Sequence, residues 1–193
     1  SIFFINDKID QGDIISQSVI NLESETTAAQ LHNNMIKVGS ELMIDTLNNI
    51  FSNTFNISIQ PVGKKLNKAP KINSQTTRIN WSNSVQEINN LVRGLSPYIS
   101  DNDFLKDKAK CPGAWFFLEL EGKRKRIKII KSKVEISDVN SNFHIDTDNK
   151  TYLKIHRKLQ SISLEFLQVE GKRIMSISEF LLGNPIYSKC RFI

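Results

Sequence analysis

Three aspartates lie close together near the start of the chain, in the stretch IFFINDKIDQGDII (residues 2–15). Asp7, Asp10 and Asp13 surround one glycine, Gly12. A carboxylate held in a turn can orient a histidine and stabilise its charged form. The same residue types also suit an ordinary turn, because aspartate bonds nearby backbone and glycine tolerates unusual dihedral angles. The residues by themselves leave both interpretations open.

A metal site is not predicted. The three acids lack the spacing of an EF-hand calcium loop. The three histidines of the chain have no spacing typical of zinc ligands.

The elements that would position the acidic turn are predicted as follows. Residues 2–5 read as a buried strand, and residues 14–22 read as a second strand. In the turn between them we expect Gly12 to adopt a positive φ and Asp10 to bond nearby backbone. A capping box at residues 27–30 then predicts a long helix that ends near residue 51.

Strand, strand and long helix form a fragment of an α/β domain. Such a fragment cannot close a core, because one sheet face and both sheet edges would lack partners. We therefore expect residues 1–60 to be the back part of a larger domain.

Charge is distributed unevenly along the chain. Residues 1–60 hold two basic and seven acidic residues, a net charge of −5, whereas residues 61–193 hold 24 basic and 13 acidic residues, a net charge of +11. This asymmetry predicts that the second part meets a polyanion. Residues 61–77 read as a linker, with two prolines, one glycine and no long periodicity.

Residues 78–193 are predicted to form a second domain. A capping box at Ser84 begins a helix that ends near Gly94. Short β-like runs follow at 114–120, 126–136, 152–157 and 162–169, with a hairpin turn at 121–123, and a capping box at Ser176 begins a last short helix. Strands at this spacing suggest a small antiparallel barrel.

The run KRKRIKIIKSK (residues 123–133) contains seven basic residues and no acid. Along a strand, Arg126, Lys128 and Ile130 would share one face, and Ile127, Ile129 and Lys131 the other. Such a strip suits a phosphate backbone that is read without base specificity. A solvated edge strand protected by lysines would have the same sequence.

Two cysteines make no disulfide framework, and no apolar run approaches the roughly 18 residues of a membrane span. We expect a reduced cytoplasmic compartment and no membrane association.

Several motifs of this chain resemble those of methionyl-tRNA formyltransferases. The segment DKIDQGDII resembles an element shared by folate-dependent formyltransferases. The motifs APKI, INW, VRGLSPY, PGAWF and LQVEGKRIMSISEFLLGN follow in the order found in the linker and C-terminal domain of the tRNA enzymes. The resemblance covers nearly the whole chain.

The resemblance implies an activity and an architecture. Members transfer a formyl group from 10-formyltetrahydrofolate to the methionine amino group of initiator methionyl-tRNA, and we expect a monomer. Residues 1–60 would be the tail of a Rossmann-like catalytic domain, residues 61–77 a basic linker, and residues 78–193 an OB-like tRNA-binding barrel. The family's catalytic asparagine and histidine would lie before residue 1, so we expect the chain alone to be inactive.

The resemblance also implies site residues. Asp10 matches the catalytic aspartate, and residues 5–10 match part of the wall against which the folate ring lies, so Ile5, Asn6, Asp7 and Asp10 are predicted folate contacts. The candidate tRNA contacts are Lys64, Lys65, Lys68, Lys71, Arg93, Lys172 and Arg173.

Two departures from the family pattern affect the second domain. The family reads SPYPGAW without a break, but here the polar segment ISDNDFLKDKAKC (residues 99–111) interrupts it. This insertion is predicted to be a surface loop that changes how the domain meets tRNA. In addition, Asn80 replaces the aspartate that usually precedes the tryptophan of the INW motif.

Two other functions stay open. A non-catalytic tRNA- or RNA-binding module would explain the basic domain but has no need of the acidic turn. Another folate-dependent formyltransferase, acting on a nucleotide sugar or hydrolysing formyl-folate, would explain the turn but not the later motifs.

Overall fold

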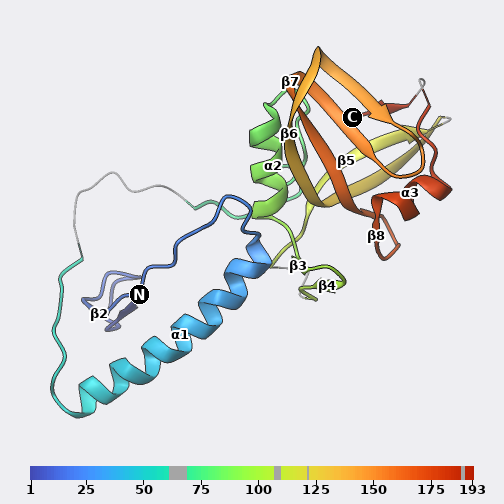
Figure 1. Ribbon diagram of the computed structural model, residues 1–193. Coiled ribbons are helices and arrows are strands. Elements are labelled where there is room, and N and C mark those ends of the chain that lie inside the picture. Colours follow the sequence, from blue (N-terminus) through green and yellow to red (C-terminus); the bar gives the residue numbers. More distant parts are fainter. Residues whose placement is uncertain (61–68, 107–109, 121, 188–189) are drawn as a thin grey trace. The chain divides into compact units, whose positions relative to one another are not determined.

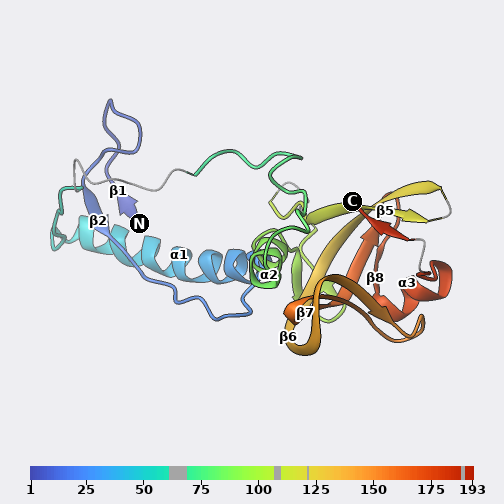
Figure 2. The same cartoon turned by 90° about the horizontal axis from the view of Figure 1, so that it is seen from above.

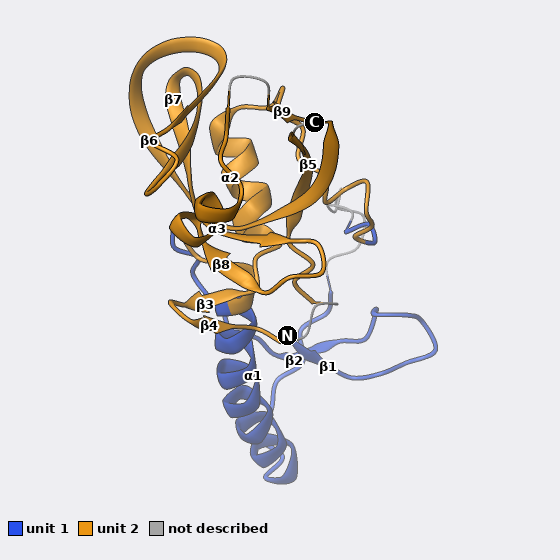
Figure 3. Ribbon diagram, turned by 90° about the vertical axis from the view of Figure 1, so that its right-hand side faces the viewer, with its two compact units in different colours: residues 1–24, 30–71 blue, residues 25–29, 72–193 orange. Residues whose placement is uncertain are grey.

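The computed structural model describes residues 1–60, 69–106, 110–120, 122–187 and 190–193. The chain forms two compact units. Unit 1 comprises residues 1–24 and 30–71, and unit 2 comprises residues 25–29 and 72–193, coloured separately in Figure 3.

Unit 1 consists of a small hairpin and most of one long helix. Strands β1 (Ile2–Phe3) and β2 (Ile14–Ser16) pair antiparallel, with Ile2 opposite Ser16 and Phe3 opposite Ile14. The second strand is shorter than predicted. Val19 and Leu22 are largely exposed, at 86% and 61%, so the apolar pattern that predicted a longer strand is not buried within the described residues.

Helix α1 (Ala28–Phe51) begins and ends where the sequence predicted. Its first residues belong to unit 2, where the Thr27 hydroxyl donates to the carbonyl of Tyr98 and the Ala29 amide donates to the carbonyl of Ser96. The remainder of the helix belongs to unit 1.

Unit 2 is built on a five-stranded antiparallel sheet with the order β8-β7-β6-β5-β9. Its strands are β5 (Ala114–Leu120), β6 (Lys123–Thr147), β7 (Leu153–Val169), β8 (Ile174–Ser176) and β9 (Arg191–Phe192). Among the described residues, β8 and β9 end this order without pairing to each other, so no closed barrel is found. A separate pair, β3 (Tyr98–Ser100) and β4 (Asp103–Phe104), lies within the predicted insertion and the residues next to it.

The short run predicted at 114–120 is confirmed as β5, whereas the two longest strands replace the other three short runs that were predicted. Figures 1 and 2 show β6 and β7 running side by side as a long, strongly curved hairpin. Their register shifts between Ile129 and Ser132, and again between Ile136 and His144. Such irregularities let a strand bend without ending. Each of the two strands therefore continues through positions at which the apolar pattern of the sequence is interrupted.

Both predicted capping boxes of unit 2 are confirmed. The Ser84 hydroxyl accepts a hydrogen bond from the Glu87 amide at the start of α2 (Val85–Gly94), and the Glu87 carboxylate accepts from the Ser84 amide. Ser176 and Glu179 make the same reciprocal bonds at α3 (Ile177–Gly183).

The core of unit 2 lies between one face of the sheet and the apolar faces of α2 and α3. Figure 1 shows α2 against the sheet and α3 next to β8. Phe116, Ile127, Leu164 and Phe180 are each at most 1% exposed. This single cluster packs on one face of β5 and β6. The basic residues of these strands lie on the opposite face.

Candidate functional site

The acidic turn of unit 1 connects β1 to β2 and is held by residues 58–60. Ile14 and Ser58 exchange two backbone hydrogen bonds of 2.8 Å, and the Gln60 carboxamide donates to the Gly12 carbonyl over 2.6 Å. The Phe4 amide donates to the Asp13 carbonyl over 3.0 Å, which closes the base of the turn.

The glycine and the aspartate play different roles from those predicted. Asp10, not Gly12, has the positive φ, at 54°. Aspartate is one of the few residues that tolerates this region. Gly12 is required for space, because a Cβ placed there would lie 1.5 Å from the Phe4 carbonyl oxygen. Asn6, rather than Asp10, bonds the local backbone: its Oδ1 accepts from the Lys8 amide over 2.9 Å.

The predicted folate contacts lie together on this turn. Ile5 is 94% exposed, and Asn6, Asp7 and Asp10 are exposed beside it. The turn therefore presents two exposed apolar side chains, Ile5 and Ile9, among polar groups, and it can form one side of a site for a flat heteroaromatic ring. His32 lies on α1, where it is half-buried and its Nδ1 lies 3.5 Å from Asn33 Oδ1.

A basic and aromatic surface covers the outer face of the sheet in unit 2. Trp115 of β5 lies opposite Lys128 of β6, and Phe117 lies opposite Arg126. The Arg126 guanidinium lies 4.1 Å from the centre of the Trp115 ring. Cations over aromatic rings are attracted by the ring electrons, so β5 and β6 hold this guanidinium in place.

Two further arginines join this surface. Arg124 lies 5.2 Å from the Phe117 ring, and Arg78 lies 5.6 Å from the Trp115 ring. Arg78 reaches it because residues 77–79 pair with Trp115 along the edge of β5. We call Arg78, Arg124, Arg126 and Lys128 the basic face; Glu119, 4.0 Å from Arg124, and the exposed Glu170 are acids near it.

The predicted alternation along β6 is partly confirmed. Ile127 and Ile129 are fully buried in the core, and Arg126 and Lys128 are on the opposite face. Ile130 is also buried, but it is not part of the core cluster: its Cδ1, like Lys128 Cδ, lies near Gly113. The edge-strand interpretation is wrong, because β6 lies between β5 and β7 at the centre of the sheet.

The other predicted tRNA contacts that the structure describes belong to both units. Lys71 is exposed at the end of unit 1, and Lys172 is exposed on the turn after β7. Lys64, Lys65 and Lys68 lie outside the described residues.

The two predicted arginines are held by intramolecular bonds. Arg93 donates from Nη1 to the Thr26 carbonyl over 3.0 Å and from Nε and Nη2 to Asn90 Oδ1. Arg173 pairs with Glu179 at 2.7 Å, which raises the pKa of the Arg173 guanidinium and lowers the pKa of the Glu179 carboxyl. Both arginines therefore also have structural roles.

Sequence reasoning named the basic run but did not assign Arg78, Arg124, Arg126 or Lys128 as site residues. The signal was the alternation of Arg124, Arg126 and Lys128 opposite that of Trp115 and Phe117. In the described part of the chain no group of three or more histidine, cysteine, aspartate or glutamate side chains could hold a metal ion, and no helix there is long and apolar enough to cross a membrane.

Known proteins resemble this chain in sequence and in fold. A methionyl-tRNA formyltransferase of Flavobacterium johnsoniae is 36% identical over 181 residues, covering 94% of this chain and 53% of the relative. One of Azobacteroides pseudotrichonymphae is 33% identical, covering 98% and 57%. The chain thus spans about half the length of the curated relatives it matches.

A solved structure, an N-formyltransferase from Helicobacter canadensis in complex with folinic acid and dTDP-3-aminofucose, matches with a TM-score of 0.56. It is 20% identical, and the match covers 84% of this chain and 53% of that one. The likeness shows a shared fold.

The sequence model of the family described as formyl transferase, C-terminal domain, matches residues 71–185, which include four of the five strands of the sheet, α2 and the basic face. The chain therefore belongs to the formyl transferase family through this C-terminal domain.

Proposed function

We propose that the protein containing this chain transfers a formyl group from 10-formyltetrahydrofolate to the amino group of methionine on initiator methionyl-tRNA. The observation that carries the proposal is a combination: curated methionyl-tRNA formyltransferases match across both units, and unit 2 has a basic face. A transferase acting on a charged tRNA needs such a face, since phosphate contacts supply most of the affinity for nucleic acid.

In this proposal the two units divide the work. Residues 1–60 are the tail of a Rossmann-like catalytic domain, residues 61–77 are the linker, and residues 78–193 are an OB-like tRNA-binding domain. The protein acts as a cytoplasmic monomer. The exposed apolar residues of α1 support this division, because the remainder of a larger catalytic domain would cover them.

Asp10 is the proposed catalytic residue of this chain. Formyl transfer requires the amine to lose a proton while the oxyanion of the intermediate is stabilised. The exposed Asp10 carboxylate would orient and charge-stabilise an imidazole supplied by the part of the protein outside the matched half. Ile5, Asn6 and Asp7 would form one wall of the folate site, and the folate would supply the formyl group.

The tRNA contacts proposed from the sequence are extended by the basic face. Lys71 and Lys172 are exposed and suit phosphate contacts; Lys64, Lys65 and Lys68 belong to the same proposal. Arg93 and Arg173 would add positive charge while keeping their internal bonds. Each phosphate contact removed should lower the slope of log affinity against log salt by about 0.7–0.9.

The test is an assay of the complete gene product with charged initiator tRNA and labelled 10-formyltetrahydrofolate. Asp10→Asn should lower kcat at least about 100-fold, the scale of a general acid–base contribution. Asp13→Asn is the matched control, because the Asp13 backbone carbonyl rather than its side chain closes the turn. Equal activity of the two variants would remove Asp10 from the mechanism.

The second candidate is formyl transfer to an amino sugar on a nucleotide, favoured by the solved N-formyltransferase with the same fold. Formylation of a dTDP-amino sugar, without formylation of charged tRNA, would establish it. Binding of tRNA with no formyl transfer to either acceptor would instead indicate a binding module.

A further inference from the structure

The first part of the insertion, residues 99–106, is described by the structure and lies next to the sheet of unit 2. Strands β3 and β4 pair antiparallel, with Tyr98 opposite Phe104, around a turn in which Asn102 has a φ of 66°. Below the hairpin, the Leu105 amide donates to the Pro97 carbonyl over 2.7 Å. The Gly113 amide then donates to the Leu95 carbonyl over 2.9 Å, so the chain returns to the point where the inserted segment departed.

A charged and aromatic contact fixes the hairpin to the sheet. The Lys131 ammonium lies 3.0 Å from both the Tyr98 hydroxyl and the Glu165 carboxylate, and 4.4 Å from the centre of the Tyr98 ring. Burial lowers the pKa of Lys131, but the bonds to Tyr98 and Glu165 outweigh this and raise it overall. The rings of Tyr98 and Phe104 each lie within 6 Å of Phe166 on β7. This packing gives one side of the adjoining cleft a fixed wall.

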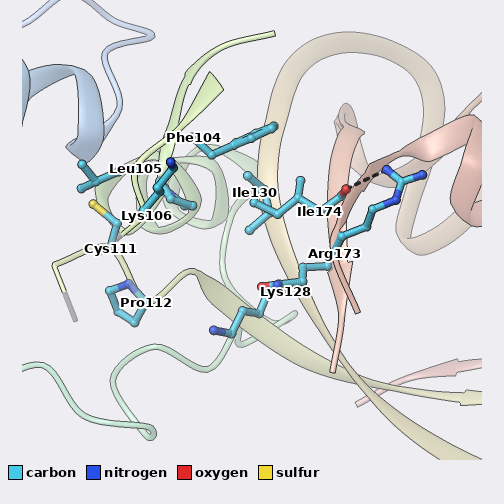
Figure 4. Close-up of a pocket in the computed structure, with 11 residues that line it drawn as sticks. Phe104, Leu105, Lys106, Cys111, Pro112, Lys128, Ile130, Arg173 and Ile174 are labelled. Atoms are coloured by element: carbon cyan, nitrogen blue, oxygen red, sulfur yellow. Dashed lines mark hydrogen bonds between the residues drawn. The ribbon is translucent and has the colours of Figure 1, made fainter. Parts of the chain in front are cut away.

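The cleft between this hairpin and the sheet has a volume of about 380 Å³ and is shown in Figure 4. We call it the insertion cleft. Its lining residues are Pro97, Phe104, Leu105, Lys106, Cys111, Pro112, Lys128, Ile130, Gln168, Arg173 and Ile174.

The lining combines apolar walls with positive charge. Phe104 and Leu105 of the insertion and the adjoining Pro112 form one side, and Ile130 and Ile174 face them from β6 and β8 (Figure 4). Among the described residues, three cationic side chains line the cleft: Lys106, Lys128 and Arg173, of which Arg173 also pairs with Glu179. Their positive charge suits an anionic ligand group.

The insertion cleft is continuous with the basic face. Lys128 belongs to both: it lies opposite Trp115 on the outer face of the sheet and also lines the cleft. Its side chain is held beside Gly113, where an added Cβ would lie 3.2 Å from Lys128 Cδ. A phosphate chain bound along Arg124 and Arg126 would therefore pass the mouth of the cleft at Lys128.

We propose that the insertion cleft holds one unpaired nucleotide of an RNA bound on the basic face. Its base would lie between the apolar side chains, and its phosphate would contact Lys128 and Lys106. Proteins commonly read RNA through unstacked bases placed against apolar or aromatic side chains, with cations on the backbone. A volume of this size suits a single nucleotide. The inference rests on the proposed function, since it takes tRNA as the acceptor.

The test compares cleft variants of the complete gene product in tRNA binding and in formylation kinetics. Ile174→Trp fills the cleft, and Lys128→Met removes a cation while keeping the aliphatic chain beside Gly113. Ile136→Trp and Lys158→Met are matched controls, because both residues are exposed on β6 and β7 and do not line the cleft.

Ile174→Trp should weaken tRNA binding about tenfold, the scale of one base contact. Lys128→Met should weaken it several-fold and lower the salt slope by about one contact. The controls should stay within about twofold. A tRNA carrying 4-thiouridine at unpaired positions should crosslink, in the unmodified protein, to the peptide that contains Phe104 and Leu105 or to the one that contains Pro112.

Each other outcome overturns the proposal in a recognisable way. If both cleft variants formylate tRNA with an unchanged KM and the crosslinks lie only elsewhere, the cleft does not hold a nucleotide of the tRNA. The proposed function would remain. If the unmodified protein neither binds nor formylates tRNA, both the cleft proposal and the proposed function are wrong. Binding of a free mononucleotide as tight as that of RNA would assign the cleft to a soluble nucleotide. If Ile174→Trp does not fold, Lys128→Met and the crosslinks decide.

Discussion

Unit 1 and unit 2 use similar apolar side chains in different ways. In unit 2, twenty buried residues form one core cluster, including Phe116, Ile127 and Phe180. In unit 1, large apolar residues such as Ile5, Ile44 and Phe51 are 94%, 61% and 84% exposed. No large apolar side chain is buried in the described part of unit 1.

This difference separates what holds each unit together. Burial of apolar area stabilises by roughly 25 cal/mol per Å², so unit 2 has a core that can maintain its fold. Unit 1 relies on helix and hairpin hydrogen bonds, which are marginal without tertiary packing. The basic face and the insertion cleft therefore belong to the unit with an apolar core, whereas the acidic turn belongs to the unit without one among the described residues.

The sharpest test of this comparison is a pair of phenylalanine truncations. Phe116→Ala removes a ring that is 1% exposed and should lower the free energy of unfolding of unit 2 by about 3–5 kcal/mol. Phe51→Ala removes a ring that is 84% exposed and should change stability by less than about 0.5 kcal/mol.

Urea unfolding followed by tryptophan fluorescence measures the first effect, since Trp81 and Trp115 both belong to unit 2. Circular dichroism at 222 nm follows α1 for the second. A large loss of helix in Phe51→Ala would show that α1 buries this ring in solution, and the contrast between the units would disappear.

A smaller effect is expected for two buried hydroxyls. The Ser132 hydroxyl donates to Asn89 Oδ1 over 2.8 Å, joining β6 to α2 in the core of unit 2. Ser132→Ala leaves that oxygen unpaired at a position 1% exposed, at a cost of about 1–3 kcal/mol.

Thr46 is the matched residue of unit 1. It is 2% exposed, but its hydroxyl donates to the Leu42 carbonyl of its own helix over 2.6 Å. That bond connects no second element and tends to bend a helix, so Thr46→Val should change stability by less than about 0.5 kcal/mol. Thermal unfolding of both variants checks the contrast, which fails if Thr46→Val is as costly as Ser132→Ala.

Local signals of the sequence predicted the helices well. The pairs Ser84 with Glu87 and Ser176 with Glu179 specify helix starts through contacts three residues apart, and both are confirmed. The exact strands were not predictable in this way. The run predicted at 126–136 extends to the longer β6, and the runs at 152–157 and 162–169 join into β7. The register shifts that allow this depend on the pairing of β6 with β7, which is a tertiary property.

The site residues show the same limit. The close approach of Gly12 to Phe4 and the position of Arg78 over Trp115 both join residues that are distant in sequence. The insertion was recognisable as a departure from the family pattern. That it pairs as a hairpin and forms a cleft with Ile130 and Ile174 depends on the sheet behind it.

The smallest expected effect concerns the turn between β6 and β7. The Asp148 carboxylate accepts hydrogen bonds from the Thr151 hydroxyl and from the amides of Lys150, Thr151 and Tyr152. These bonds, that of the Thr151 hydroxyl first, hold the pKa of Asp148 well below its usual range. A carboxyl whose pKa is lowered by folding stabilises the folded state above its unfolded pKa of about 3.9 and loses this contribution as pH falls through the folded pKa.

Asp148→Asn should therefore lower the Tm of unit 2 slightly at neutral pH, and the difference from the unmodified protein should shrink as pH falls below about 4. Glu119→Gln is the control, because its carboxylate lies 4.0 Å from Arg124 on the exposed face and makes no comparable set of backbone bonds among the described residues. The turn connects the two longest strands of unit 2. A difference in Tm that stays constant with pH would mean that the asparagine variant loses the same stability whether or not Asp148 is ionised. Ionisation of Asp148 would then not stabilise the β6–β7 hairpin.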